Sequence, residues 1–364
     1  MKKNMIEWKN SIIASQEVKA MPIMAYEGLM LLRKNILEMV TSSEVHYLSL
    51  KALSERYPSM AAATVAMALY MEAEAFGSDI NYYKNEIPSV SKRLINSFSS
   101  LEKIRIPDIG EGKTGETLKA AKLAIDNITD RPVFGGIIGP YSLAGRLYGM
   151  TEMMPAILSE PEKSQELLQI CTDFLKKYAK ALKDAGLNGV IIAEPSAGLL
   201  AENECHKFSS YFVKQIVDFV QDENFIVILH NCGNTATLIN SMVSTGSVGF
   251  HFGNTADMAH ILSQIPSGRL VFGNLDPVGI IKNGTIESIK ARTIELLNKT
   301  ASFKNFVLST GCDVPPETKI ENIDAFFNAL EEFNNNQIKS IEVDYRNSSE
   351  TELSDLMGND LFVA

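Results

Sequence analysis

The sequence predicts an α/β protein, a (β/α)8 TIM barrel preceded by an N-terminal helical extension. From residue 132 onward, short apolar runs alternate with longer helical stretches, as expected for parallel strands joined by helices. With the runs before residue 132, the chain holds about eight strands, and eight units favour a closed barrel over an open sheet. An open doubly wound sheet is the alternative, although no G-x-G-x-x-G motif follows an early strand to support a nucleotide-binding version of it.

The elements follow from local patterns in chain order. Strands are predicted at residues 22–26, 79–82, 132–138, 188–193, 225–229, 247–251, 269–272 and 306–309. Helices are predicted at residues 4–20, 28–40, 60–76, 116–128, 161–185, 208–221, 235–244, 258–264, 285–299 and 320–333. The stretch 60–76 is predicted as a helix because Ala, its commonest residue, is the best helix former and Gly77 would end it.

The domain organisation that we expect is a single barrel over residues 1–364. Within this domain, we expect residues 1–20 to contain an N-terminal helix. The end of the chain, residues 334–364, is rich in Asn and acidic residues, and we expect a final helix or a loosely held tail there.

Composition and charge argue against several classes of function. The net charge of -10 argues against a nucleic-acid surface, because phosphate binding needs concentrated Lys and Arg. Four Cys in 364 residues are too sparse for a disulfide framework and favour a reducing compartment. The N-terminus carries charges where a signal peptide has an apolar core, and polar residues interrupt the longest uncharged stretch, 224–256. We therefore expect a cytoplasmic protein that binds neither nucleic acid nor membrane.

The strongest chemical signal is a His-x-Cys pair followed by a distant Cys. The predicted strand 225–229 runs directly into His230 and Cys232, which leave an extended chain on the same side because they are two residues apart. A second apolar run, F-V-L-S-T-G-C, ends at Cys312. One imidazole and two thiolates suit zinc, and three protein ligands are typical of a catalytic site that keeps one position open.

This donor set favours one kind of chemistry. Two thiolates leave a zinc ion less electrophilic than three imidazoles would, so water activation is not its best use. A substrate thiol, in contrast, is deprotonated outright when it binds such a metal. The residues therefore point to S-alkylation of a thiol, with zinc-dependent hydrolysis as the competing interpretation.

Other polar residues also follow the predicted strands, where the loops of a barrel place reacting groups. Helix capping is the alternative role for Glu194, Asp276 and Asp313, because polar residues at strand ends often cap the next helix. The set at the strand ends is Tyr26, Glu194, His230, Cys232, His251, Asn274, Asp276, Cys312 and Asp313, with Tyr141 in the G-P-Y turn after 132–138.

Several motifs, in this order, resemble the uroporphyrinogen decarboxylase superfamily in its methyltransferase branch. That branch includes methylcobamide:coenzyme M methyltransferases and the methyltransferases of corrinoid-dependent O-demethylases. The resemblance runs from about residue 8 to residue 330. Its marks are E-A-E-A-F-G at 72–77, G-I-I-G-P-Y-S-L-A-G-R-L at 136–147, A-E-P-S-A-G-L-L at 193–200, L-H-N-C-G-N at 229–234, H-F-G-N at 251–254, G-N-L-D-P at 273–277 and T-G-C-D-V-P-P-E-T at 310–318.

The resemblance implies a (β/α)8 barrel and a zinc ion held by His230, Cys232 and Cys312. It implies methyl transfer between a methylcobamide, free or on a separate corrinoid protein, and an acceptor that is usually a thiol. Glu194 matches an acidic position near the site and is a candidate for a fourth, displaceable ligand. The partners expected are the corrinoid and a small thiol or methylated molecule, and a homodimer is compatible with them.

The remaining candidates have supporting roles. His251, Asp276 and Asp313 are candidates for orienting ligands or substrate. The predicted catalytic set consists of Glu194, His251 and Asp313. Tyr26 and Tyr141 are candidates for shaping the cavity. The corrinoid would be bound by a group made up of Tyr26, Tyr141, Asn274 and Asp276.

Two other functions stay open at this point. A cofactor-free decarboxylase is one, but the region around 22–34 has only Arg33 where decarboxylases of this superfamily carry an Arg-rich stretch for substrate carboxylates. A non-catalytic barrel that binds a corrinoid or a metal is the other.

Overall fold

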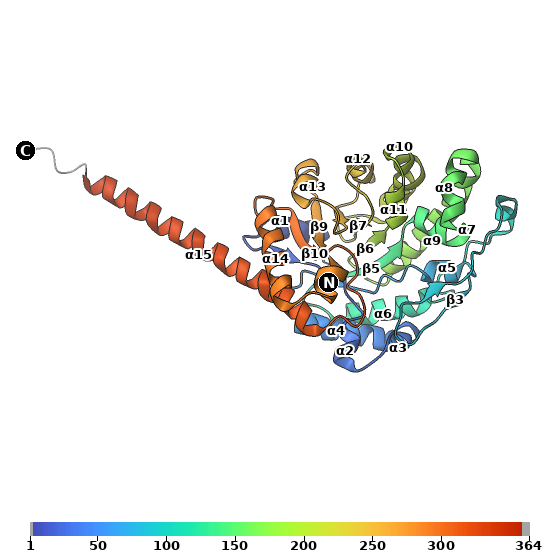
Figure 1. Ribbon diagram of the computed structural model, residues 1–364, viewed down its shortest axis with the longest axis horizontal. Coiled ribbons are helices and arrows are strands. Elements are labelled where there is room, and N and C mark those ends of the chain that lie inside the picture. The colour runs from blue at the N-terminus through green and yellow to red at the C-terminus, as the bar shows by residue number, and fades with distance from the viewer. Residues whose placement is uncertain (1–2, 359–364) are drawn as a thin grey trace, which may run out of the picture.

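The computed structural model describes residues 3–358, with side chains described through residue 339. Eight parallel strands form one sheet in the order β1-β10-β9-β8-β7-β6-β5-β2. The two edge strands meet, because Ala61 N–H donates to Ala20 C=O at 2.8 Å and Ala20 pairs in parallel with Met60. The sheet is therefore curled into a (β/α)8 barrel, which confirms the predicted fold class (Figure 1). The strands are β1 (Lys19–Ala20), β2 (Ala63–Thr64), β5 (Val133–Ile138), β6 (Gly189–Ala193), β7 (Ile226–Asn231), β8 (Gly249–Phe252), β9 (Leu270–Leu275) and β10 (Phe306–Thr310).

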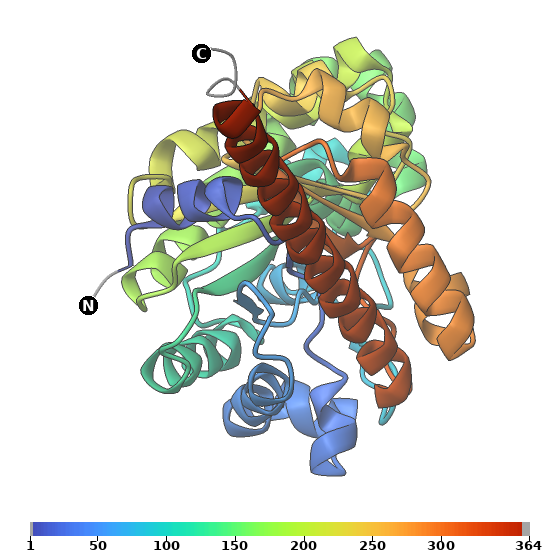
Figure 2. The same ribbon diagram turned by 90° about the vertical axis from the view of Figure 1, so that its left-hand side faces the viewer.

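Helices lie around the outside of the strands (Figures 1 and 2). The α-helices are α1 (Met5–Ala14), α2 (Gly28–Leu32), α3 (Ile36–Thr41), α4 (Ser43–Arg56), α5 (Met71–Ala75), α6 (Thr114–Asn127), α7 (Pro140–Tyr148), α8 (Met150–Ser159), α9 (Pro161–Asp184), α10 (Glu202–Cys205), α11 (Tyr211–Val220), α12 (Ile239–Val243), α13 (Met258–Gln264), α14 (Ile286–Thr300) and α15 (Ile320–Gly358). Short 3-10 helices are η1 (Phe98–Lys103) and η2 (Pro195–Leu199), and π-helical turns are η3 (His206–Ser210) and η4 (Pro277–Lys282).

The strands place alternate residues inside and outside the barrel. In β7, Val227 and Leu229 pack outward with the helices, whereas Ile226 and Ile228 belong to the apolar cluster inside the barrel. His230 continues the inward series by the same period of two. The strand thus carries this imidazole to the carboxyl-terminal mouth of the barrel.

The opposite end of the barrel is closed by α1. Met5 and Ile12 of this helix pack in the same cluster as the inward-facing Phe134, and Trp8 meets the Phe134 ring at 5.7 Å between centroids. Asn4 caps the helix through its side chain, which accepts from Ile6 N–H at 3.0 Å. With this end closed by an apolar plug, the barrel is open to ligands at its carboxyl-terminal mouth.

The first quarter of the chain differs from the prediction. The strand predicted at 22–26 lies earlier, at β1, because Pro22 has no N–H to continue the ladder beyond Met21. The helix predicted at 28–40 is two helices. Arg33 adopts φ 54° at the end of α2, and Asn35 and Glu38 then form a reciprocal capping box that starts α3.

The helix predicted over 60–76 is helical only in its last part, at α5 (Met71–Ala75). Residues 63–64 form β2, the second strand of the barrel, because Ala63 and Val65 N–H groups donate to the carbonyls of Pro132 and Phe134 beside β5. This pairing overrides the helix propensity of alanine, which is a weak preference. The predicted strand at 79–82 belongs instead to a separate antiparallel pair, β3 (Ile80–Asn81) with β4 (Ser89–Val90).

The last helix leaves the barrel. Phe326, Phe327 and Leu330 of α15 are buried, and the helix then projects beyond the other helices as far as Gly358 (Figure 1). The segment predicted as a final helix or tail is therefore helical through residue 358, and residues 359–364 lie outside the described part. Among the helices that the structure describes, none combines the length and apolar character needed to cross a membrane.

Candidate metal centre at the barrel mouth

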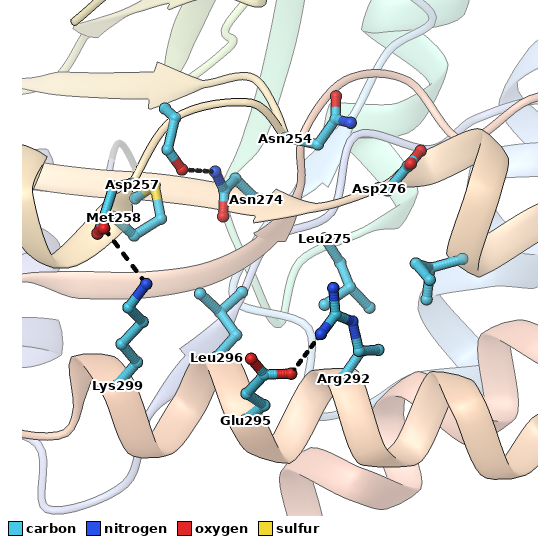
Figure 3. Close-up of a pocket in the computed structure, with 12 residues that line it drawn as sticks. Asn254, Asp257, Met258, Asn274, Leu275, Asp276, Arg292, Glu295, Leu296 and Lys299 are labelled. Atoms are coloured by element: carbon cyan, nitrogen blue, oxygen red, sulfur yellow. Dashed lines mark hydrogen bonds and ion pairs between the residues drawn. The ribbon is translucent and has the colours of Figure 1, made fainter.

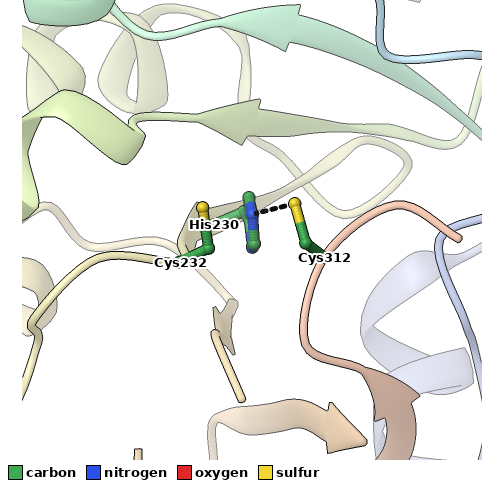
Figure 4. A group of neighbouring side chains, drawn as sticks. All are labelled: His230, Cys232 and Cys312. Atoms are coloured by element: carbon green, nitrogen blue, oxygen red, sulfur yellow. Dashed lines mark hydrogen bonds between the residues drawn. The ribbon is translucent and has the colours of Figure 1, made fainter. Parts of the chain in front are cut away.

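Three side chains from two strand ends converge at the mouth. His230 is the inward residue near the end of β7, Cys232 follows two positions later, and Cys312 follows β10 across the barrel (Figure 4). One ligand atom from each lies within 4.8 Å of the other two, and Cys312 Sγ is 3.7 Å from His230 Nε2. The structure therefore brings together the three predicted ligands. One nitrogen and two sulfur donors at this spacing suit a tetrahedral thiophilic metal.

The pKa values of the two thiols shift in opposite directions. A hydrogen bond from Cys312, with further help from His230, holds the pKa of Cys232 well below its usual range. The hydrogen bond to Cys232, followed by burial and the charge of Asp313, raises the pKa of Cys312. Two thiolates side by side repel each other, so a bound cation is what would let both ionise at neutral pH. The donor set therefore fits a divalent metal.

A chain of hydrogen bonds orients His230. Ser309 Oγ donates to Met21 C=O at 2.8 Å, so its single proton is used and His251 Nε2–H must donate to Ser309 Oγ at 2.9 Å. Burial, followed by the nearby His230, lowers the pKa of His251 well below its usual value, so His251 is neutral and its Nδ1 is an acceptor. His230 Nδ1–H donates to that Nδ1 at 2.8 Å. The lone pair of His230 is thereby placed on Nε2, the atom that faces Cys312.

The sheet register accounts for this chain. His230 and His251 are paired neighbours on β7 and β8, both facing inward. Ser309 occupies an inward position on β10, one residue beyond the outward-facing Leu308. Inward residues of several strands meet in layers inside such a barrel. The orienting partner predicted at His251 thus contacts the ligand directly.

Glu194 is buried, and its carboxylate binds backbone N–H groups rather than joining the three ligand atoms. Its Oε2 accepts from Tyr141 N–H at 3.0 Å and its Oε1 from Ser142 N–H at 2.6 Å, at the amino-terminal end of α7. A side chain on Gly139 would collide with this carboxylate, so glycine is needed there. Burial raises the pKa of Glu194 to about 7 against the effect of these hydrogen bonds. The carboxylate does not join the metal-ligand group, and its predicted role as a fourth ligand has no support from this geometry.

Asp313 and the two tyrosines lie at the mouth. Asp313 and Tyr26 line one small pocket. Burial, followed by the charge of Cys232, raises the pKa of Asp313 to about 7. The Tyr141 hydroxyl is buried with no hydrogen-bond partner among the described residues, and burial and Glu194 raise its pKa. The Tyr26 hydroxyl is likewise buried without a hydrogen-bond partner in the described part of the chain.

Asn274 and Asp276 make local contacts instead. Asn274 Nδ2–H donates to Gly253 C=O at 2.8 Å, and Asp276 Oδ1 accepts from Val278 and Gly279 N–H groups at the start of η4. Both residues line a separate pocket of about 170 Å³ beside α14, where Arg292 pairs with Glu295 (Figure 3). The capping alternative therefore describes Asp276, and corrinoid binding by these two residues stays a prediction.

Comparison with known proteins shows the family of this chain. The family model described as uroporphyrinogen decarboxylase (URO-D) matches residues 20–333. The methylcobamide:CoM methyltransferase MtbA of Methanosarcina acetivorans is 30% identical over 275 residues, which cover 72% of this chain and 77% of that protein. The chain belongs to the uroporphyrinogen decarboxylase superfamily, in its methyltransferase branch. This membership identifies it as a methyltransferase.

Other members of the superfamily are similar at lower identity. A uroporphyrinogen decarboxylase of Synechococcus sp. is 27% identical over 267 residues, covering 70% of this chain and 73% of that protein. A solved structure described as a methyltransferase from Methanosarcina mazei superposes with a TM-score of 0.81 at 24% identity. It covers 91% of this chain and 98% of that one, and it supports the barrel fold.

Several polar residues at the mouth of this methyltransferase were not singled out from the sequence. Ser309 is the penultimate residue of β10, and Glu27 follows Tyr26 directly, so the same strand-end rule applies to both. Glu72 lies in the E-A-E-A motif, and its Oε1 accepts from Ile138 N–H at 3.0 Å. The helix predicted at 60–76 hid the strand that precedes Glu72. Tyr70 lies in the same loop and was hidden in the same way.

Proposed function

We propose that this family member transfers a methyl group from a methylcobamide to the sulfur of a small thiol, and that His230, Cys232 and Cys312 hold zinc for this reaction. The observation that carries the proposal is the convergence of one imidazole and two thiols within 4.8 Å at the barrel mouth. A zinc ion bound there would supply the positive charge that keeps an acceptor thiol deprotonated at neutral pH. The methylcobamide is either free or carried by a separate corrinoid protein.

The transfer itself is a displacement at the methyl carbon. The thiolate sulfur forms the new sulfur–carbon bond, the cobalt–carbon bond breaks, and its electron pair stays on cobalt. The thiol proton leaves before this step. Asp313 is the proposed group to receive it, because it directly follows Cys312.

The exposure of the ligands supports approach from outside the barrel. His230 is 2% exposed, whereas Cys232 and Cys312 are partly exposed at the mouth. A bulky corrinoid cannot enter the packed barrel interior, so its methyl group must meet the acceptor at this outer face. The hydrogen-bond chain through His251 and Ser309 keeps His230 Nε2 directed toward the same face.

The decarboxylase alternative is less well supported. Arg131 is the one Lys or Arg that is buried among the described residues. Its guanidinium donates to the carbonyls of Tyr57 and Met60 near the start of β2, at the end of the barrel that is opposite the mouth. No buried cation is thus available at the mouth, within the described residues, to neutralise the carboxylates of a porphyrinogen.

The test is methyl transfer from methylcobalamin to a panel of small thiols, with zinc content measured by elemental analysis. We expect about one zinc per chain and a methylated thiol. Cys312→Ser should lose both, whereas Cys205→Ser should keep both, because the Cys205 sulfur lies in a separate buried cluster 3.9 Å from Ser210 Oγ.

The competing functions give different results. Decarboxylation that survives chelation and Cys312→Ser would favour the cofactor-free alternative. Cobamide binding without turnover on any thiol, by fully metal-loaded protein, would favour a non-catalytic barrel and contradict thiol methylation.

A further inference from the structure

The two thiols of the metal centre lie on different loops that pack on one shared turn. We call residues 253–256, directly after β8, the bridging turn. Gly253 N–H donates to Asn231 C=O at 3.2 Å, and a side chain on Gly253 would place its Cβ only 2.6 Å from the carbonyl oxygen of Cys232. The bridging turn therefore touches the backbone of Cys232 itself, and only glycine permits so close an approach.

The same turn supports the loop that carries Cys312. A Cβ on Gly311 would lie 2.9 Å from the Cα of Asn254, so Gly311 also packs directly on the bridging turn. Gly311 N–H donates to Leu275 C=O at 2.7 Å, which ties this loop to the end of β9. The turn thus contacts Cys232 on one side and the residue before Cys312 on the other. Its position sets the separation of the two sulfur atoms.

Asn274 holds the bridging turn in place. Its Nδ2 donates one hydrogen bond to Gly253 C=O at 2.8 Å and another to Ala256 C=O at 2.7 Å, so a single amide joins the two ends of the turn (Figure 3). Asn274 is 8% exposed and directly precedes Leu275 on β9. The strand end that binds Gly311 therefore also carries the side chain that fixes the turn.

The chemistry of this position requires an amide. The two backbone atoms that Asn274 contacts are carbonyl oxygens, which only accept hydrogen bonds, and the amide nitrogen supplies two donors. A carboxylate of the same shape would place oxygen against oxygen. An alanine would remove the donor from Ala256 C=O, and an acceptor that loses its partner in a protein interior destabilises its local structure.

The tip of the bridging turn is open to solvent. Asn254 and Thr255 are exposed, whereas Gly253 is buried. Packing therefore contributes little to the position of the tip. The hydrogen bonds from Asn274 are what keep the two ends of the turn together.

We propose that Asn274 is a positioning residue for the metal centre, which holds the bridging turn and thereby the separation of the Cys232 and Cys312 sulfur atoms. The inference rests on the proposed function, because it concerns the zinc ligands of that reaction. It gives Asn274 an indirect role at the metal centre, which is distinct from the corrinoid contact predicted from the sequence.

The first experiment compares Asn274→Ala with a matched control, Asn305→Ala. Asn305 is also buried and its Nδ2 donates to Arg269 C=O at 2.8 Å, but this pair lies at the amino-terminal ends of β10 and β9. Competition with a chromophoric chelator measures zinc affinity. We expect Asn274→Ala to bind zinc about tenfold more weakly, at the lower end of the range for lost outer contacts of a metal ligand. Asn305→Ala should keep the wild-type affinity.

A spectroscopic measurement separates positioning from general destabilisation. With Co²⁺ in place of zinc, the thiolate-to-cobalt charge-transfer absorption reports the cobalt–sulfur bonds and does not report His230. We expect this absorption to weaken in metal-saturated Asn274→Ala and to be unchanged in Asn305→Ala. Urea unfolding of the metal-free variants measures the general loss of stability, which should occur in both.

A second pair of variants tests the bridging turn and decides the inference if Asn274→Ala does not fold. Gly253→Ala places a Cβ against the backbone of Cys232, so it should weaken zinc binding and the charge-transfer absorption in the same way. Gly268→Ala is its control, because a Cβ at Gly268 meets no atom within 4 Å.

The outcomes separate this inference from the proposed function. Wild-type zinc affinity and charge-transfer absorption in both Asn274→Ala and Gly253→Ala overturn the inference, while the zinc site stands. A higher KM for methylcobalamin in Asn274→Ala with unchanged zinc affinity also overturns it and favours a corrinoid contact. Wild-type protein that binds no zinc contradicts the proposed function before any variant is compared.

Discussion

At one side of the barrel mouth, the side chains of β7, β8 and β10 form a fully paired network. His230, His251 and Ser309 each use both a donor and an acceptor, and the network ends on the carbonyl of Met21. At the other side, the carboxyl of Glu27 and its neighbouring phenols are buried without partners among the described residues. Both sides are buried to a similar degree, so burial alone does not explain the difference.

The difference concerns what each side contributes to the protein. A metal ligand needs a fixed lone pair in a fixed direction, and complete hydrogen bonding supplies that. A buried carboxyl without a full set of partners instead holds its proton more tightly, because burial disfavours its charged form. Changes at the first side should therefore alter metal affinity, and changes at the second should alter how stability depends on pH.

The largest effect should come from removing a ligand on the paired side. We expect the zinc affinity of His230→Ala to fall by more than it would if a ligand lost only its outer hydrogen-bond partner. That smaller loss is typically about 10–100-fold. Competition with a chromophoric chelator measures this affinity. His260→Ala, at an exposed position on α13, is the control. Wild-type affinity in His230→Ala would show that the metal, if bound, lies elsewhere.

A smaller effect is expected at His251. His251→Ala leaves His230 Nδ1–H without its acceptor, so the imidazole can rotate or carry its proton on Nε2. We expect zinc affinity to fall about 10–100-fold while the side chains of Cys232 and Cys312 stay in place. The same chelator competition measures it. An unchanged affinity would mean that the packing of the barrel alone orients His230.

Ser309→Ala should sharpen this comparison further. The substitution removes the acceptor of His251 Nε2–H but leaves both imidazoles, so a buried donor loses its partner. We expect a stability loss of about 1–3 kcal/mol and a loss of zinc affinity below that of His251→Ala. Urea unfolding of the metal-free protein gives the first quantity. If Ser309→Ala weakened zinc binding more than His251→Ala, the order of the hydrogen-bond chain would be wrong.

The sequence predicted the paired side better than the unpaired side for a physical reason. Strands β5 to β10 are long apolar runs with helices between them, so the residues after them could be placed at one mouth before the structure was known. His230, Cys232 and Cys312 follow this rule. The hydrogen-bond chain behind His230 was predicted only in general terms, because its last bond, from Ser309 to Met21, joins residues 288 positions apart.

The unpaired side was obscured by its short strands. Strands β1 and β2 contain two residues each, too few for a period of two to be recognised. Alanine-rich β2 was predicted as a helix, which hid Tyr70 and Glu72 as strand-end residues. Whether a buried carboxyl has a partner depends on neighbouring chain segments, so the contrast between Glu194 and Glu27 could not be predicted from local sequence.

The smallest predicted effect is a pH dependence of folding stability that comes from the unpaired side. Glu72 is buried, and only one of its carboxylate oxygens has a partner among the described residues. Burial raises its pKa from 4.5 to about 7. The folded chain therefore holds this proton more tightly than the unfolded chain, and the stability it contributes below pH 4.5 is lost as the pH rises toward 7. Glu72→Gln stays neutral, so its unfolding midpoint should fall less than that of the wild type between pH 5 and pH 7.

Glu116→Gln should change the pH dependence of stability in the opposite direction. The hydrogen bond from Lys119 lowers the pKa of Glu116, so the stability contributed by this carboxylate is present above its unfolded pKa and is lost as the pH falls below it. Thermal unfolding of the three proteins at a series of pH values checks both signs. Because Glu116 is half-exposed on a helix, its effect should be small and confined to acid pH. Parallel curves for the wild type and Glu72→Gln between pH 5 and pH 7 would show that Glu72 is as well paired as Glu194, and the contrast between the two sides would then rest on Glu27 and the tyrosines alone.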